Sequence, residues 1–128
     1  MSSLTLRAEG GAPAEEVWLR YITPGRWPSW SPQIRAVRGT GERLAPGVRG
    51  EVVSLFGITA AFTVESVDEP RWCWAWRVRL GPARLRLLHE VARRPGGSAT
   101  TLRIEGPAVL VAAYAGPARW ALGRLVRP

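Results

Sequence analysis

His89 is the only histidine in this chain of 128 residues, and its side chain is the one best suited to acid–base chemistry. It lies in the run RLRLLHEV, residues 84–91, on the same alternating face as Leu85 and Leu87. Burial disfavours the charged imidazole, so we expect His89 to stay neutral. A neutral imidazole can take a proton from a carbon next to a carbonyl, as aldol cyclisation requires. The alternative is a histidine that only forms a hydrogen bond within an apolar wall.

Tyr114 is the second candidate, because the apolar spacing of residues 108–126 turns it inward, where its hydroxyl could donate a hydrogen bond to a ligand carbonyl. It could equally be a packing residue. Glu65 and Glu90 alternate outward, so a Ser-His-Asp type of triad has no acidic member. One histidine and one cysteine on opposite faces cannot hold a metal, and a chain without lysine cannot form a Schiff base. We expect no cofactor.

Three tryptophans, Trp72, Trp74 and Trp76, alternate along RWCWAWRVRL, residues 71–80, and share its apolar face. Three indoles on one face exceed what a core usually requires, which favours an aromatic-lined pocket for a planar or polycyclic ligand. We expect Trp74 and Trp76 to face the ligand and Trp72 to pack. The alternative is a filled core that the indoles close. Further candidate walls of the pocket are Trp30, Phe62, Leu87 and Leu102.

Four arginines, Arg77, Arg79, Arg84 and Arg86, share the opposite face of the same two runs. Like charges this close repel each other unless they are solvated or paired. They could form a docking surface for an acidic partner, such as a carrier protein or an anionic lipid surface, with binding that weakens in salt. The alternative, which we favour, is a solvated face in a chain whose 18 basic residues are all arginine.

The two runs that carry these side chains predict a β-hairpin, because both alternate and Gly81-Pro82 between them is typical of a turn. One face of the hairpin then carries the indoles and the imidazole, and the other carries the arginines. Alternation and turn residues predict five further strands, at residues 4–8, 34–38, 51–56, 58–67 and 99–105.

Helices are predicted on either side of these strands. Pro13 and an acidic first turn favour a helix start at residues 12–22, and residues 26–32, RWPSWSP, predict a short helical turn or a packed loop. A long helix is predicted over residues 108–126. The order is one strand, two short helices, six antiparallel strands and a long helix, which is an α+β layout. A sheet of this size must curl, and we expect a gap between it and the helix.

Composition limits the function classes that remain. The length fits one domain over residues 1–128, and 46% hydrophobic residues are enough for a core. The net charge of +8 invites a nucleic-acid partner, but the arginines are scattered along the chain, so we expect none. No apolar run approaches the roughly 20 residues of a transmembrane segment. A single cysteine and no signal-peptide pattern favour a cytoplasmic protein. The oligomeric state stays open, with a homodimer among the alternatives.

Several segments together resemble a known family. They are APAEEVW, RWPSWSP, the turn before a Trp-rich strand, LHEV, a Gly-Gly turn followed by TTL, and EGP before the last helix. This pattern is similar to that of the START-like superfamily, in particular its polyketide cyclase/dehydrase and lipid-transport branch, and it covers residues 4–125.

The resemblance implies a helix-grip fold, in which a curved seven-stranded antiparallel sheet wraps around a long C-terminal helix, with two short helices after the first strand. It also implies a hydrophobic, aromatic or polyketide-like ligand in the cavity between sheet and helix. Some members of the superfamily are aromatase/cyclases, so cyclisation or dehydration of the ligand by His89 and Tyr114 is one expected activity. A lipid or small-molecule carrier without catalysis is the other.

Overall fold

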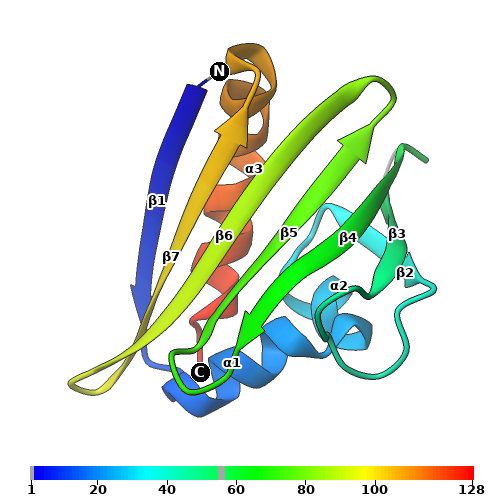
Figure 1. Ribbon diagram of the computed structural model, residues 1–128. Coiled ribbons are helices and arrows are strands. Elements are labelled where there is room, and N and C mark those ends of the chain that lie inside the picture. Colours follow the sequence, from blue (N-terminus) through cyan, green and yellow to red (C-terminus); the bar gives the residue numbers. More distant parts are fainter. Residues whose placement is uncertain (1, 55–56) are drawn as a thin grey trace.

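A curved antiparallel sheet and one long helix form the two layers of the protein (Figure 1). The computed structural model describes residues 2–54 and 57–128. In these residues seven strands form one sheet in the order β1-β7-β6-β5-β4-β3-β2. The strands are β1 (Ser2–Gly10), β2 (Ile34–Arg38), β3 (Arg49–Ser54), β4 (Thr59–Asp68), β5 (Cys73–Leu80), β6 (Ala83–Arg94) and β7 (Gly97–Gly106). The helices are α1 (Ala14–Ile22), the 3-10 turn η1 (Pro24–Arg26), α2 (Trp27–Trp30) and α3 (Ala108–Leu125).

The predicted fold class is confirmed, since α3 follows the sheet and the short helices follow β1. The bounds of β2 are as predicted, whereas most other strand ends differ by one to three residues. β6 and β7, for example, extend further because their pairing continues to Arg94 and Gly97. The strand predicted at residues 51–56 begins earlier, at Arg49. Its last two residues, 55 and 56, lie outside the described residues.

Trp72 is not on a strand, contrary to the alternation proposed for residues 71–80. Its φ of 53° places it in the left-handed region, in the turn that precedes β5. A residue other than glycine rarely adopts this backbone conformation without a local reason. Here the backbone N–H of Trp72 donates to the carbonyl of Glu69, and the N–H of Val91 donates to the carbonyl of Trp72. The indole of Trp72 packs under the guanidinium of Arg93, whose central carbon lies 4.8 Å from the ring centroid.

The amphipathic spacing of α1 determines how it packs on the sheet. Its buried side chains recur with helical period: Ala14, Val17, Trp18, Tyr21 and Ile22. Pro13 precedes its first turn, and the two carboxylates of that turn lie near the positive end of the helix dipole. In Figure 1 α1 lies at one end of the sheet, next to the C-terminal end of α3. The inner face of α1 therefore closes that end of the interior.

Along α3, Val111, Ala118, Leu122 and Leu125 are buried against the inner face of the sheet. The sheet contributes alternate residues, because successive strand side chains point to opposite faces. On β7, for example, Thr100, Leu102 and Ile104 are buried, as the alternation predicts. In the described residues no helix is both long enough and apolar enough to cross a membrane.

The short strand β2 forms one edge of the sheet. Its pairing with β3 shifts register between Ile34 and Ala36, which leaves Arg35 as the extra residue of a bulge. A second register shift, between Val64 and Ser66 on β4, leaves Glu65 as an extra residue opposite β5. This shift places the carboxylate of Glu65 on the outer face, among the arginines of β5 and β6.

Candidate functional site

A small cavity lies between the sheet, the short helices and α3. Its volume is about 40 Å³. It is smaller than the gap expected from the sequence, because aromatic rings from the helices and the sheet fill most of the interior. The lining residues are Tyr21, Trp27, Trp30, Ser31, Gln33, Ile34, Trp74, Trp76, His89, Leu102, Tyr114, Ala118, Ala121 and Leu122.

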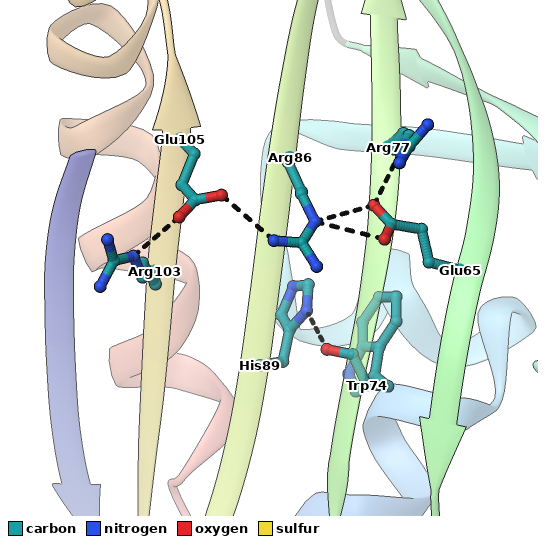
Figure 2. Close-up of polar contacts among 7 residues, drawn as sticks. All are labelled: Glu65, Trp74, Arg77, Arg86, His89, Arg103 and Glu105. Carbon is teal, nitrogen blue, oxygen red and sulfur yellow. Dashed lines mark hydrogen bonds and ion pairs between the residues drawn. The ribbon is translucent and has the colours of Figure 1, made fainter. Parts of the chain in front are cut away.

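His89 lines this cavity from β6 and is 6% exposed. Its imidazole stacks on the indole of Trp74, with ring centroids 3.8 Å apart and planes 4° apart. The Nδ1 atom lies 3.2 Å from the backbone carbonyl oxygen of Trp74 (Figure 2). A carbonyl oxygen only accepts, so Nδ1 carries the proton and Nε2 carries the lone pair. Burial lowers the pKa of His89 to about 3, against the weaker opposing effect of the hydrogen bond to Trp74.

Trp74 and Trp76 line the cavity from β5, with exposed fractions of only 3% and 7%. The indole N–H of each is buried and has no acceptor among the described residues. A buried donor without a partner costs about 1–3 kcal/mol. Most buried polar groups in proteins have a partner, so these two donors are unusual features of the interior.

Tyr114 lines the cavity from α3 and is half-buried. Burial raises the pKa of its hydroxyl to about 12, so the hydroxyl stays protonated and can donate a hydrogen bond. The two proposed catalytic side chains, His89 and Tyr114, therefore border the same small space. Whether they act on a ligand stays a prediction.

The other predicted walls divide into two groups. Trp30 and Leu102 line the cavity. Phe62 and Leu87 are buried but do not line it. The ring of Phe62 instead packs on Trp76, with centroids 4.6 Å apart, behind the indole that borders the cavity. Alternation correctly turned these side chains inward, but it could not determine their depth behind the larger indoles.

Sequence reasoning missed Tyr21 and Trp27 as lining residues. The hydroxyl of Tyr21 lies 2.5 Å from Oγ1 of Thr100, and burial raises the pKa of this tyrosine above its ordinary value, against the effect of that hydrogen bond. The hydroxyl of Thr100 donates a hydrogen bond to the carbonyl of Glu90, at 3.0 Å. The hydroxyl of Tyr21 is therefore the donor in its bond with Thr100. The Trp27 Nε1 atom donates to the carbonyl of Tyr21 at 2.7 Å. The buried spacing of residues 14–22 was the one signal that could have indicated Tyr21.

The outer face of β5 and β6 is not purely basic (Figure 2). Arg77 and Arg86 both donate to Glu65, at 2.9 Å and 3.0 Å, and Arg86 also lies 3.3 Å from Glu105. Burial alone would raise the pKa of Glu65, but the hydrogen bonds from Arg86 and Arg77 hold it below its ordinary value. Two of the four arginines predicted to form a docking surface are therefore paired with carboxylates, which weakens that alternative. The described residues contain no cluster of three potential metal ligands.

With this geometry in place, comparison with known proteins identifies the family. The model of the family described as "Polyketide cyclase / dehydrase and lipid transport" matches residues 1–128. The chain belongs to this family. The predicted resemblance to the polyketide cyclase/dehydrase and lipid-transport branch of the START-like superfamily is thereby confirmed. No curated protein matches the sequence.

Solved structures share the fold of this member of the family. Ara h 8.0201 has a TM-score of 0.75 at 10% identity, over 97% of this chain and 94% of the other. Protein CV1439 from Chromobacterium violaceum has a TM-score of 0.75 at 15% identity, over 96% and 93% of the two chains. The di-domain ARO/CYC BexL, from the BE-7585A biosynthetic pathway, has a TM-score of 0.80 at 17% identity, over 98% of this chain and 45% of BexL. At these identities the likeness shows the fold alone.

Proposed function

We propose that the protein binds a small, mainly apolar molecule that carries a carbonyl or hydroxyl oxygen, in the cavity between the sheet and α3. The observation that carries this proposal is the pair of buried indole N–H groups, on Trp74 and Trp76, that have no acceptor in the described residues. An oxygen of the ligand would accept from them and remove their cost of burial. The family supports a ligand of this kind, because polyketides are rich in ketone groups.

The size of the cavity limits how such a ligand enters. A volume of about 40 Å³ holds a few water molecules, whereas pockets for drug-sized ligands have roughly 300–1,000 Å³. A ligand therefore has to displace lining side chains. Trp30 and Tyr114 are the large lining residues that remain half-buried, so they are the ones that move.

Binding without catalysis is the form of the proposal that the electrostatics favour. A general base works best when its pKa lies near the operating pH. The pKa of His89, about 3, lies well below neutral pH, which makes Nε2 a weak base for removing a proton from carbon. A neutral Nε2 is nevertheless a good acceptor for a ligand hydroxyl. In this form His89 orients the ligand.

Cyclisation or dehydration is the second candidate, and the shared cavity of His89 and Tyr114 favours it. In such a reaction Nε2 of His89 takes a proton from a carbon next to a ketone. The resulting enolate carbon forms a bond to a second carbonyl carbon of the same ligand, and the phenol of Tyr114 protonates the alkoxide that forms. A proton then passes from the imidazolium of His89 to the phenolate of Tyr114, which returns both side chains to their starting states.

A matched pair of ligands tests the binding proposal. Titration with 1-tetralone and with tetralin, followed by tryptophan fluorescence, compares a ketone with a hydrocarbon of the same ring system. We expect the ketone to bind about 10-fold more tightly, because a site built to hydrogen-bond an oxygen rejects an analogue that lacks it. Trp76→Phe removes one donor and should shrink that preference. Trp120→Phe is the control, because the side chain of Trp120, on α3, is 57% exposed. Equal affinity for the two ligands in the unaltered protein would refute the proposal.

Turnover separates the carrier from the enzyme. The protein and its His89→Ala variant are incubated with a linear poly-β-ketone, and cyclised product is measured by mass spectrometry, with thermal melting as the control for folding. A carrier gives no product above the uncatalysed level in either protein. Product that depends on His89 would establish the second candidate, and product that persists in the variant would exclude His89 as the base.

A further inference from the structure

A surface groove of about 290 Å³ lies where the C-terminal end of α3 meets α1, η1 and α2. In Figure 1 this is the end of the molecule where the last turn of α3 lies beside α1. Four of its lining side chains are arginines, contributed by α1, by η1, by α3 and by the residues that follow α3. The lining residues are Arg20, Arg26, Ser29, Trp30, Arg124, Arg127 and Pro128.

Positive charge in this groove is only partly balanced. Among the described residues, Glu16 is the acidic side chain that forms ion pairs with these arginines, with Arg20 at 3.5 Å and with Arg26. Arg124 and Arg127 have no carboxylate partner within the part of the chain that the structure describes. One side-chain carboxylate among the described residues thus pairs with a groove of four guanidinium groups, and an anion entering the groove would reduce their mutual repulsion.

Hydrogen bonding in the groove is also incomplete. Arg20 already serves the helix end, since its Nη1 donates to the carbonyls of Leu125 and Arg127 at 2.6 Å and 2.7 Å. Arg124 differs: its Nη2 makes one long bond, 3.3 Å, to the carbonyl of Ser29. Its Nε–H is buried and has no acceptor among the described residues. The guanidinium of Arg124, which lines the groove, therefore keeps a donor that no described residue satisfies.

A structural role accounts for only part of this arrangement. Arginines near the C-terminal end of α3 complement the helix dipole, which accounts for the positions of Arg20 and Arg124. Arg20 also donates to the carbonyl of Leu125, and Arg124 to that of Ser29. Arg26, from η1, has a structural partner in Glu16, but nothing of this kind explains why the exposed Arg127 lies in the same groove. Guanidinium groups that converge in this way match the oxygens of phosphoryl and carboxylate groups, which they bind through two parallel hydrogen bonds.

We propose that this groove binds an anionic group, a phosphate or a carboxylate, through Arg124, Arg127 and Arg26. The inference goes beyond the proposed function and does not depend on it, because an anion can occupy the groove while the interior cavity holds only water. The two sites are nevertheless adjacent, since Trp30 lines both of them. An acidic group in the groove would lie beside the indole that covers the interior cavity.

Calorimetric titration with inorganic phosphate at low salt tests the groove directly. We expect binding that weakens as salt is added, since exposed charges are screened. The double variant Arg124→Gln/Arg127→Gln should weaken it about 10-fold or more, the usual effect of losing charge-assisted hydrogen bonds. Arg79→Gln/Arg84→Gln is the matched control, because it removes the same charge from exposed arginines on the outer face of the sheet.

Two results would overturn the inference. One is the absence of phosphate binding to the unaltered protein, and the other is an equal loss of affinity in the two double variants. If Arg124→Gln/Arg127→Gln fails to fold, Arg127→Glu alone replaces it, because that side chain is exposed. A phosphate-binding protein that ignores 1-tetralone would retain this inference and lose the proposed function, and the converse result would do the opposite.

Decyl phosphate and octanoate distinguish the sources of the anion. If the natural ligand is an amphiphile, decyl phosphate binds more tightly than inorganic phosphate, and Trp30→Ala changes that gain. If the ligand is a free phosphorylated metabolite, the decyl chain adds nothing. Preference for octanoate over both phosphates would assign the groove to a carboxylate. Each of these results supports an anion site, provided that the Arg124→Gln/Arg127→Gln variant loses the binding.

Discussion

The imidazole of His89 and the indole of Trp74 lie parallel, 3.8 Å apart, and are joined a second time by the bond between Nδ1 and the Trp74 carbonyl. These residues face each other in the pairing of β5 with β6. The stack fixes the ring plane, and the hydrogen bond fixes the tautomer. The hairpin that presents the imidazole to the cavity therefore also determines which nitrogen meets a ligand.

Acid should destabilise the protein through His89. Its folded-state pKa of about 3 lies below the ordinary 6.5, so the unfolded chain binds the proton more readily. The free energy of unfolding is therefore unaffected by this group above about pH 6.5 and falls as the pH drops from there towards about 3. Between about pH 7.5 and about pH 5, the protein should lose about 2 kcal/mol more than a His89→Phe variant.

Urea denaturation of both proteins at the two pH values gives this difference. Phenylalanine keeps a flat ring against Trp74 and cannot titrate, so the carboxylates contribute equally to both measurements. Parallel losses of stability in the two proteins would show that His89 gains a proton in the folded state.

Removing the Tyr21 hydroxyl should destabilise the fold more than removing that of Tyr114. Tyr21→Phe leaves Oγ1 of Thr100, which is fully buried, without its donor, at a cost of about 1–3 kcal/mol. Tyr114→Phe breaks no hydrogen bond made by the described residues and should cost about 0.5 kcal/mol or less. Chemical denaturation measures both. Equal costs would mean that the bond between Tyr21 and Thr100 contributes little.

Two glycines should respond to alanine in opposite directions. A Cβ on Gly97 would lie 1.9 Å from the backbone oxygen of Gly10, so β1 and β7 would have to separate. A Cβ on Gly123, in α3, meets nothing within 4 Å. We expect Gly97→Ala to cost more than about 2 kcal/mol and Gly123→Ala to stabilise by about 0.5–1 kcal/mol. Thermal melting of the two variants checks the prediction, and a neutral Gly97→Ala would contradict the close approach of these strands.

Trp27 should contribute more to stability than any surface tryptophan. Its indole is 1% exposed, packs on Trp76 with ring centroids 5.1 Å apart, and donates to the carbonyl of Tyr21. Trp27→Phe loses that bond and leaves a void, at an expected cost of about 2–4 kcal/mol. Trp120→Phe, on an exposed side chain, should change stability by less than about 0.5 kcal/mol. Denaturation curves that shift equally would refute this ranking.

Periodicity predicted the sheet, both layers and the direction of most side chains, because alternation and helical spacing are local properties of the chain. It placed His89, Trp74 and Trp76 on one face, where the structure has them. It failed for Trp72, since the left-handed backbone at that residue depends on the hydrogen bonds of a turn rather than on the pattern. It also missed Tyr21 and Trp27, because contacts between distant segments determine which ring borders the cavity.

The bulge at Arg35 has a consequence for the behaviour of the protein in concentrated solution. An edge strand presents unpaired backbone groups to which another chain can add, and this is a common first step of aggregation. On β2 the irregular backbone and the exposed Arg35 and Arg38 oppose such addition. A second copy that approaches β2 meets like charge and an irregular hydrogen-bonding pattern. This edge of the sheet therefore resists the addition of further strands and growth into fibrils.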